Sequence, residues 1–185
     1  MRNCGDCQLC CKLVPVKTLG KPAGEKCQHQ RFRKGCAIYA RRPFDCRVWS
    51  CRWLSDPDTA ELRRPDRSHY VIDCMFDYIK LTEKATGEPI KVPCLQVWLD
   101  PRYPDAHHDP ALRAYLERRG QEGVLALIRK DAYEGFVLWP PSMTNCGWQI
   151  QHGTPEGEHS AASVGDVLCQ HRESAAPARS SIEGA

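Results

Sequence analysis

Four cysteines stand within eight residues at the start of the chain, CGDCQLCC at positions 4 to 11, and this cluster constrains the fold most. Four more follow before residue 52, namely Cys27, Cys36, Cys46 and Cys51. No stretch approaches the roughly 18 apolar residues of a membrane-spanning helix, and the N-terminus lacks the apolar segment of a secretory signal. We therefore expect a cytoplasmic protein without membrane contact, whose thiols stay reduced. In that setting, clustered cysteines bind metal more often than they form disulfides.

Eight thiolates are too many for one tetrahedral ion. They suit two four-coordinate sites, one polynuclear cluster, or one cluster and one ion. If residues 4–11 are helical, a rotation of about 100° per residue places Cys4, Cys7 and Cys11 on one face and turns Cys10 away. The adjacent pair then favours more than one metal centre, or a second site beginning at Cys10. If the stretch is a loop, the angles fail, but two adjacent thiols must still be divided between metals.

The residues around the later cysteines complete a specific pattern. CxxCxxCC is followed by a lone cysteine and then by GCAIYARRPFDCRVWSC at positions 35 to 51. This order resembles the YkgJ-like cysteine-cluster proteins, which are described as zinc- or iron-chelating domains. Besides the cysteines, the residues in register are Ile38, Tyr39, Arg42, Pro43 and Arg47. The sequence departs from the family at Trp49, where an aromatic such as Phe is usual, and at Gln28-His29, where Pro-Phe is common.

The resemblance covers about residues 4–51 and implies metal binding, but it says little about the biological process. It implies these metal ligands: Cys4, Cys7, Cys10, Cys11, Cys27, Cys36, Cys46 and Cys51. Zinc with four thiolates closes its coordination shell and serves structure. The close run of Cys4, Cys7 and Cys10 instead resembles the ligand spacing of iron–sulfur proteins. The expected cofactors are therefore zinc or iron ions, and an iron–sulfur cluster is the alternative.

The first hypothesis for function is a metal-binding protein that holds zinc or iron through these cysteines. The second hypothesis is an iron–sulfur redox or catalytic protein. The sequence contains no GxSxG, no HExxH and no glycine-rich phosphate loop, so it leaves enzymatic activity undecided. A thiol oxidoreductase using CxxC is a weaker hypothesis, because that motif usually opens a helix in a βαβ context.

Two arginines and a tyrosine lie beside the cysteines. Arg42 and Arg47 either form a solvated face or donate hydrogen bonds to thiolate sulfur. Tyr39 either packs over the cluster or fills the core. His29 is a weaker candidate ligand, and His107-His108 is expected at the surface. Chance placement along a polar segment explains the remaining histidines better than a ligand role; these are His152, His159 and His171.

The other four cysteines are expected to be structural. Cys74 shares strand parity with Ile72 and Phe76, which predicts a place in the core. Cys94 is expected to face about Tyr78 on the opposing strand, so no disulfide with Cys74 is predicted. Cys146 follows the last strand, and Cys169 lies in the tail.

The charge is uneven along the chain. Residues 1–54 carry 12 Lys or Arg and 3 Asp or Glu, for a net charge of +9, whereas the remainder carries −6. Eight thiolates and two divalent metals would reduce +9 to +5, so much of the excess offsets ligand charge. No aromatic–basic interleaving stands out, so nucleic acid is not expected. The expected partners are metal ions and a protein partner.

The pattern predicts an α+β fold. Residues 1–149 form one cysteine-cluster domain, with a metal-stabilised ligand region at 4–51 packed on an α+β core at 55–140. Strands are predicted in 69–83, 90–100 and 135–141, forming a small antiparallel sheet. A short helix with Ser55 or Asp56 as N-cap precedes them. A helical pair is predicted from Asp109 as N-cap to Gly120 past the end, continuing over 122–130. Residues 150–185 are rich in Gly, Ser, Ala and Pro and are predicted to be a disordered tail.

Overall fold

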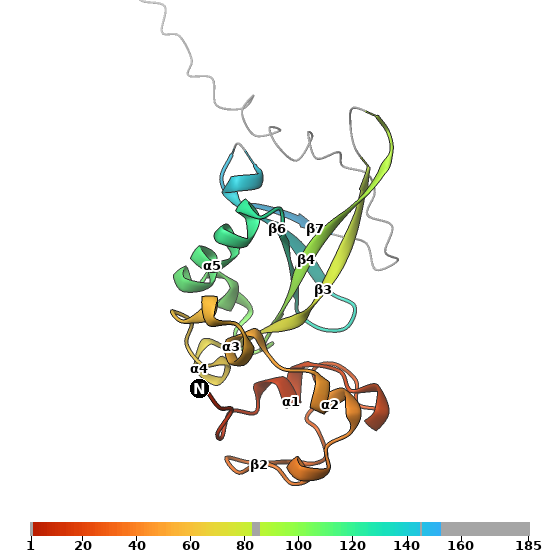
Figure 1. Cartoon of the computed structure of the whole chain (residues 1–185), viewed down its shortest axis with the longest axis vertical. Coiled ribbons are helices and arrows are strands. Elements are labelled where there is room, and N and C mark those ends of the chain that lie inside the picture. Colours follow the sequence, from red (N-terminus) through yellow and green to blue (C-terminus); the bar gives the residue numbers. More distant parts are fainter. Residues whose placement is uncertain (1, 83–85, 145, 153–185) are drawn as a thin grey trace, which may run out of the picture.

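The computed structural model describes residues 2–82, 86–144 and 146–152 (Figure 1). It is a mixed α+β fold with a five-stranded sheet, one long helix and several short helices. An N-terminal module, residues 4–51, lies at one end of the sheet. The tail predicted from residue 150 lies outside the described residues from 153 onward. Its first three residues belong to a strand, which corrects the predicted boundary.

The sheet is mixed, not antiparallel as predicted. Its strands, in spatial order, are β3 (Tyr70–Thr82), β4 (Pro89–Leu99), β5 (Leu125–Arg129), β6 (Gly135–Trp139) and β7 (Gln149–His152). All neighbours pair antiparallel except β4 and β5, which are parallel. A parallel pair needs a crossover, and the helix α5 (Pro110–Gln121) supplies it.

The start of α5 follows its sequence pattern. The Asp109 carboxylate accepts a hydrogen bond from the Ala111 amide at 2.9 Å, and Pro110 occupies the first helical position, as predicted. Its predicted apolar stripe is buried: Leu112, Tyr115 and Leu116. Gly120, however, lies inside the helix, not past its end. A Cβ there would stand 2.3 Å from Pro140 Cγ, so packing against Pro140 explains this glycine.

The second predicted helix, over 122–130, is wrong. After Gly123, whose φ of +79° turns the chain, these residues form the buried strand β5. A strand buried on both faces is a continuous apolar run and has no period that separates it from a helix.

Two apolar layers flank the sheet. Every second side chain along the strands faces α5 and forms the main core. Its members include Leu95, Val97, Ile128 and Leu138. The intervening residues form a smaller cluster on the opposite face: Ile79, Leu81, Cys94, Leu125, Val137 and Trp139. The sheet therefore holds its own core without the N-terminal module.

Short helices join the module to the sheet. They are α3 (Arg52–Ser55), the 3-10 turn η3 (Pro57–Thr59) and α4 (Pro65–Ser68). Asp56 caps η3 by accepting a hydrogen bond from the Asp58 amide at 2.9 Å, so the predicted cap is present on a shorter helix. Other 3-10 turns are η4 (Pro104–His108) and η5 (Pro141–Met143). Within the described residues, no helix is long and apolar enough to cross a bilayer.

The N-terminal module consists of short elements and contains little apolar core. These are α1 (Leu9–Leu13), η1 (Lys17–Leu19), the strand pair β1 (Gln30–Arg31) and β2 (Gly35–Cys36), η2 (Tyr39–Arg41) and α2 (Phe44–Val48). Between residues 14 and 50, the only buried residue is Lys21. Apolar burial therefore contributes little to the order of this part of the chain, because only Val14, Ala23 and Trp49 pack partly buried against the sheet contact.

The module meets the sheet through a small apolar contact and one ion pair. Leu9 and Leu13 of α1 pack with Cys51 against Val71 and Trp98. Beside this contact, the Lys12 ammonium donates to the buried Asp100 carboxylate at 2.8 Å. Burial by itself would raise the pKa of Asp100. Hydrogen bonds from Arg102 and Lys12 outweigh it and hold this pKa well below its usual range.

We expect Asp100→Asn to lower the free energy of unfolding by about 1–3 kcal/mol near neutral pH, because the Lys12 charge loses its partner. A depressed folded-state pKa contributes stability above the unfolded value of about 4, and this stability is lost as pH falls below it. Urea unfolding of wild type and variant should therefore converge below about pH 4. Asp105→Asn, at an exposed carboxylate in η4, is the control. A deficit that stays constant down to acid pH would contradict this account.

Candidate metal centre

The first four cysteines lie on a turn followed by a short helix. The Cys7 amide donates to the Cys4 carbonyl at 2.9 Å, and Gly5 has a φ of +52°, so this segment is a turn. Helix α1 begins only at Leu9. The predicted common helical face for Cys4, Cys7 and Cys11 is therefore wrong, and the loop alternative holds. Cys10 and Cys11 lie on α1 and are half-buried.

The later cysteines are tied back to α1 by hydrogen bonds. The Cys27 amide donates to the Cys11 carbonyl at 3.0 Å. The Gln8 side-chain amide donates to the carbonyls of Arg31 and of Gly35, the latter at 2.9 Å, and so fixes the strand pair that carries Cys36. Gln8 is nearly fully buried, and sequence reasoning missed it, because its partners are distant in the chain.

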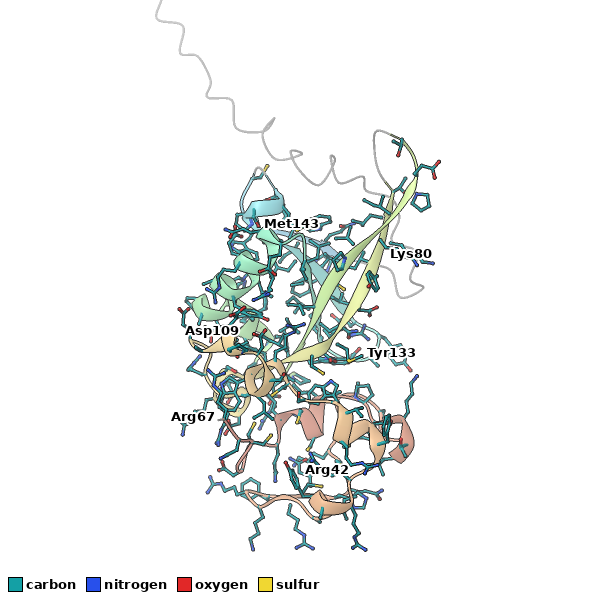
Figure 2. The ribbon with its side chains drawn as sticks, in the orientation of Figure 1. Arg42, Arg67, Lys80, Asp109, Tyr133 and Met143 are labelled. Atoms are coloured by element: carbon teal, nitrogen blue, oxygen red, sulfur yellow. The ribbon has the colours of Figure 1, made fainter. Side chains whose placement is uncertain are left out.

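The last two of the eight cysteines belong to α2 and to the start of α3. Cys46 lies on α2, and Cys51 is buried at the N-cap of α3. The backbone of Cys51 forms an isolated β-bridge with Asp73 of β3. Chain segments far apart in sequence thus bring all eight cysteines into one end of the molecule, where Figure 2 draws the sulfur atoms in yellow.

Repulsion links Cys46 with Cys11, Cys27 and Cys36, and it links Cys51 with Cys4, Cys7 and Cys10, so we assign the eight thiols to two groups. Burial and then repulsion from Cys11, Cys27 and Cys36 raise the pKa of Cys46. Burial raises the pKa of Cys51 to about 11, with added repulsion from Cys4 and Cys7. Cys10 is also repelled by Cys51 and Cys7. We call these the first group (Cys4, Cys7, Cys10 and Cys51) and the second group (Cys11, Cys27, Cys36 and Cys46).

The two groups meet at the adjacent pair. A hydrogen bond with Cys11 is the main cause that raises the pKa of Cys10, and burial adds to it. The same bond lowers the pKa of Cys11 to about 7 against the effect of burial, and the charges of Lys21 and Arg42 assist. Cys4 also interacts with Cys11 across the boundary. The thiols whose pKa is raised are thus protonated near neutral pH, and a bound cation would favour their thiolate forms; they are Cys4, Cys7, Cys10, Cys46 and Cys51.

Lys21 is a site residue that the sequence gave no reason to choose, since it lies in a Gly/Pro segment. It is buried, and its ammonium donates to three carbonyl oxygens, of Lys12 at 3.1 Å, Val14 at 2.6 Å and Pro22 at 3.0 Å. Burial lowers its pKa, while the neighbouring thiolates of Cys27, Cys11 and Cys10 oppose that effect. Lys21 therefore brings a fixed positive charge to the second group.

Arg42 and Tyr39 form a pair at the edge of the module. The Arg42 guanidinium lies 3.7 Å from the centre of the Tyr39 ring, and its Nε donates to the Tyr39 carbonyl at 3.0 Å, not to sulfur. Arg42, labelled in Figure 2, still lowers the pKa of Cys4 and Cys11 through its charge, after the larger effects on each thiol. Tyr39 is 58% exposed, so the alternative in which it fills the core is wrong. Arg47 is exposed.

Asp66 is a second residue that sequence reasoning missed. Burial by itself would raise the pKa of this carboxyl, but hydrogen bonds from Arg64 and from the Cys7 thiol lower it. Arg64 also pairs with Asp6 at 2.7 Å, so it links the opening turn to α4.

The cysteines outside the module differ from one another. Cys94 is fully buried in the smaller apolar cluster and pairs in register with Asp77, one residue from the predicted position. Cys74 is half-buried, because a β-bulge between Ile72 and Phe76 breaks the parity that predicted a core position. Cys146 is exposed. Cys169 lies outside the described residues, as do His159 and His171.

The histidines differ in their exposure. His29 is half-buried, and its backbone carbonyl accepts from the Ala37 amide at 2.8 Å. His107 is buried, with Nδ1 3.0 Å from the Pro104 carbonyl oxygen, which corrects the expected surface position; His108 is exposed. His152 is exposed at the end of β7.

The thiol donors suit a metal that prefers sulfur ligands, whereas the side chains are not arranged around a common centre. Across residues 2–82, 86–144 and 146–152, no three His, Cys, Asp or Glu side chains stand close enough to hold an ion. The thiols are neighbours on short elements, so coordination would require side-chain rotation and closure of the turns. Comparison with family models, curated proteins and solved structures finds no match to this chain.

Proposed function

We propose that this chain is a metal-binding protein that holds zinc or iron through its eight N-terminal cysteines. The observation that carries the proposal is the contrast within the module. Eight cysteines from separate segments gather there, while residues 14–50 bury only Lys21. A metal-ligand set can order a segment of this kind where apolar burial cannot. The resemblance to YkgJ-like proteins supports the same ligand set.

The first and second groups each hold four thiols, which is the number that a closed tetrahedral zinc site takes. In this proposal, Cys10 serves one centre and Cys11 the other. The division accounts for the adjacent pair, because neighbouring side chains on a helix diverge by about 100°. Lys21 and Arg42 reduce the excess negative charge that four thiolates place around a divalent ion.

An iron–sulfur redox protein is the second candidate. The two groups meet at the Cys10–Cys11 hydrogen bond, and Cys4 interacts with Cys11, so the thiols also suit one polynuclear centre. The protein is proposed to act in the cytoplasm, where its thiols remain reduced, and to contact a protein partner there.

Elemental analysis of protein purified without oxygen, with acid-labile sulfide measured in parallel, tests the proposal. Two closed zinc sites predict about two zinc ions per chain, no sulfide and no colour. An iron–sulfur centre predicts iron, sulfide and charge-transfer absorbance between about 300 and 450 nm. Protein that contains neither metal, and that takes up neither from solution under reducing conditions, would exclude both forms of the proposal.

A further inference from the structure

A pocket of about 420 Å³ lies outside the N-terminal module, between α5 and the β6–β7 end of the sheet. It is lined by His108, Arg113, Leu138, Trp148 and Ile150. Asp109, labelled in Figure 2, marks the start of α5, and Arg113 follows it by one helical turn. Trp148 and Ile150 come from the segment at 146–152, so α5 and this segment build the pocket together.

Arg113 is the cation of this pocket. Its Nε donates to the His107 carbonyl at 2.7 Å, and its guanidinium carbon lies 4.5 Å from the centre of the Trp148 ring. These contacts fix the plane of the guanidinium, and no described residue accepts a hydrogen bond from the four N–H groups on its two Nη atoms. Arg113 is half-buried, so these donors are held partly out of water.

In the part of the chain that the structure describes, no carboxylate balances the charge of Arg113. No Asp or Glu of the described residues forms an ion pair with it. Two further arginines, at the opposite end of α5, form ion pairs. Arg118 pairs with Glu61, and Arg119 pairs with Asp58. Around the pocket, the His107 and His108 rings lie 4.0 Å apart, and burial lowers the pKa of His107. Asp105 is the acidic neighbour of His107.

Apart from His108, the other walls are apolar. Leu138 is fully buried, Ile150 is 46% exposed, and the Trp148 ring is partly buried against the main core. Small-molecule sites commonly combine such walls with a few fixed polar groups, and an arginine fork matches the geometry of carboxylate and phosphate.

We propose that this pocket binds a small organic oxyanion, a carboxylate or phosphate carried on a flat apolar body. Arg113 donates to the oxyanion, and the apolar body lies against Ile150 and Trp148. The pocket uses no cysteine, so this ligand site is independent of the proposed metal function.

Isothermal titration of the full chain with benzoate and phenyl phosphate, and with benzamide as the neutral probe of similar shape, tests the proposal. We expect saturable one-to-one binding of at least one anion, about tenfold or more tighter than benzamide, because a charged arginine pair contributes that much. The tighter anion identifies the carboxylate or the phosphate as the preferred group. Benzamide binding as tightly as both anions, or no saturation by either at about 10 mM, would overturn the proposal.

Two variants and a matched control locate the binding. Arg113→Gln removes the charge, and Ile150→Glu places a competing carboxylate in the pocket while leaving the Arg113–His107 hydrogen bond in place. Each should weaken anion binding about tenfold or more. Arg118→Gln, on the same helix but outside the pocket, should bind as wild type does. If Arg113→Gln loses the native circular dichroism, Ile150→Glu decides. Wild-type affinity in the folded variants would show that the anion binds elsewhere.

Discussion

Removal of bound metal under reducing conditions is expected to raise amide hydrogen exchange sharply across residues 4–51 and to leave residues 68–140 largely protected. Ordering backbone costs on the order of 1–2 kcal/mol per residue. Between residues 14 and 50, the chain fully buries no apolar side chain, and only Val14, Ala23 and Trp49 pack partly buried against the apolar contact with the sheet. A structural zinc site contributes roughly 10–16 kcal/mol of apparent folding free energy near neutral pH. The metal is therefore the main source of order in the module under the proposed function.

The loss of protection should be graded within the module. Leu9 and Leu13 pack against Val71 and Trp98, so α1 has an apolar anchor on the sheet that the segment at 26–48 lacks. We expect the 26–48 segment to open first and most completely. The sheet has apolar cores on both faces, and its strongest protection should remain in β4 and β5.

Exchange is measured by mass spectrometry on metal-loaded protein, on chelator-treated protein and on treated protein after metal is returned. The third sample is the control, because recovered protection separates metal loss from irreversible thiol chemistry. Equal protection of residues 4–51 in all three samples would mean that metal does not order them. A transport or catalytic role for the cysteines would then become the better hypothesis.

Local features of this chain could be predicted from its sequence, because they depend on near neighbours. The Asp109 cap, Pro110 at the first helical position and the buried stripe of α5 all follow from residues within one or two turns. The strands β4 and β6 were likewise expected. Strand β5 was not, because its apolar run gains its conformation by pairing in parallel with β4, a contact that leaves no local pattern.

In the candidate site, too, the sequence predicts some features, whereas others depend on contacts between distant segments. The cysteine pattern marked all eight module cysteines, but not how they are grouped. Grouping depends on bonds between distant segments, such as the Cys27 amide with the Cys11 carbonyl and Gln8 with Gly35. Lys21 and Asp66 approach the thiols only after folding. Residue type alone therefore could not identify these two neighbours.

Alanine substitution of one cysteine from each group is expected to remove metal in a pattern that reveals the number of centres. Cys7 belongs to the first group, and Cys36 to the second. If each group closes around its own ion, Cys7→Ala and Cys36→Ala should each lower the content from about two metal ions per chain to about one. The double variant should then retain almost none. Three thiolates and water can still hold an ion weakly, so the content should be measured after dialysis against a mild chelator.

A single polynuclear centre predicts a different result. Loss of one ligand then destabilises the whole cluster, so each single variant should lose nearly all metal and any acid-labile sulfide. Cys146→Ser, at an exposed thiol, and Cys94→Ala, in the apolar cluster, are the controls. Both should keep the wild-type metal content, although Cys94→Ala should lower the unfolding free energy by about 1–3 kcal/mol because it leaves a cavity. Unchanged metal content in both Cys7→Ala and Cys36→Ala would mean that these thiols are not ligands, since a four-thiolate site cannot lose a ligand without weakening its hold on the ion.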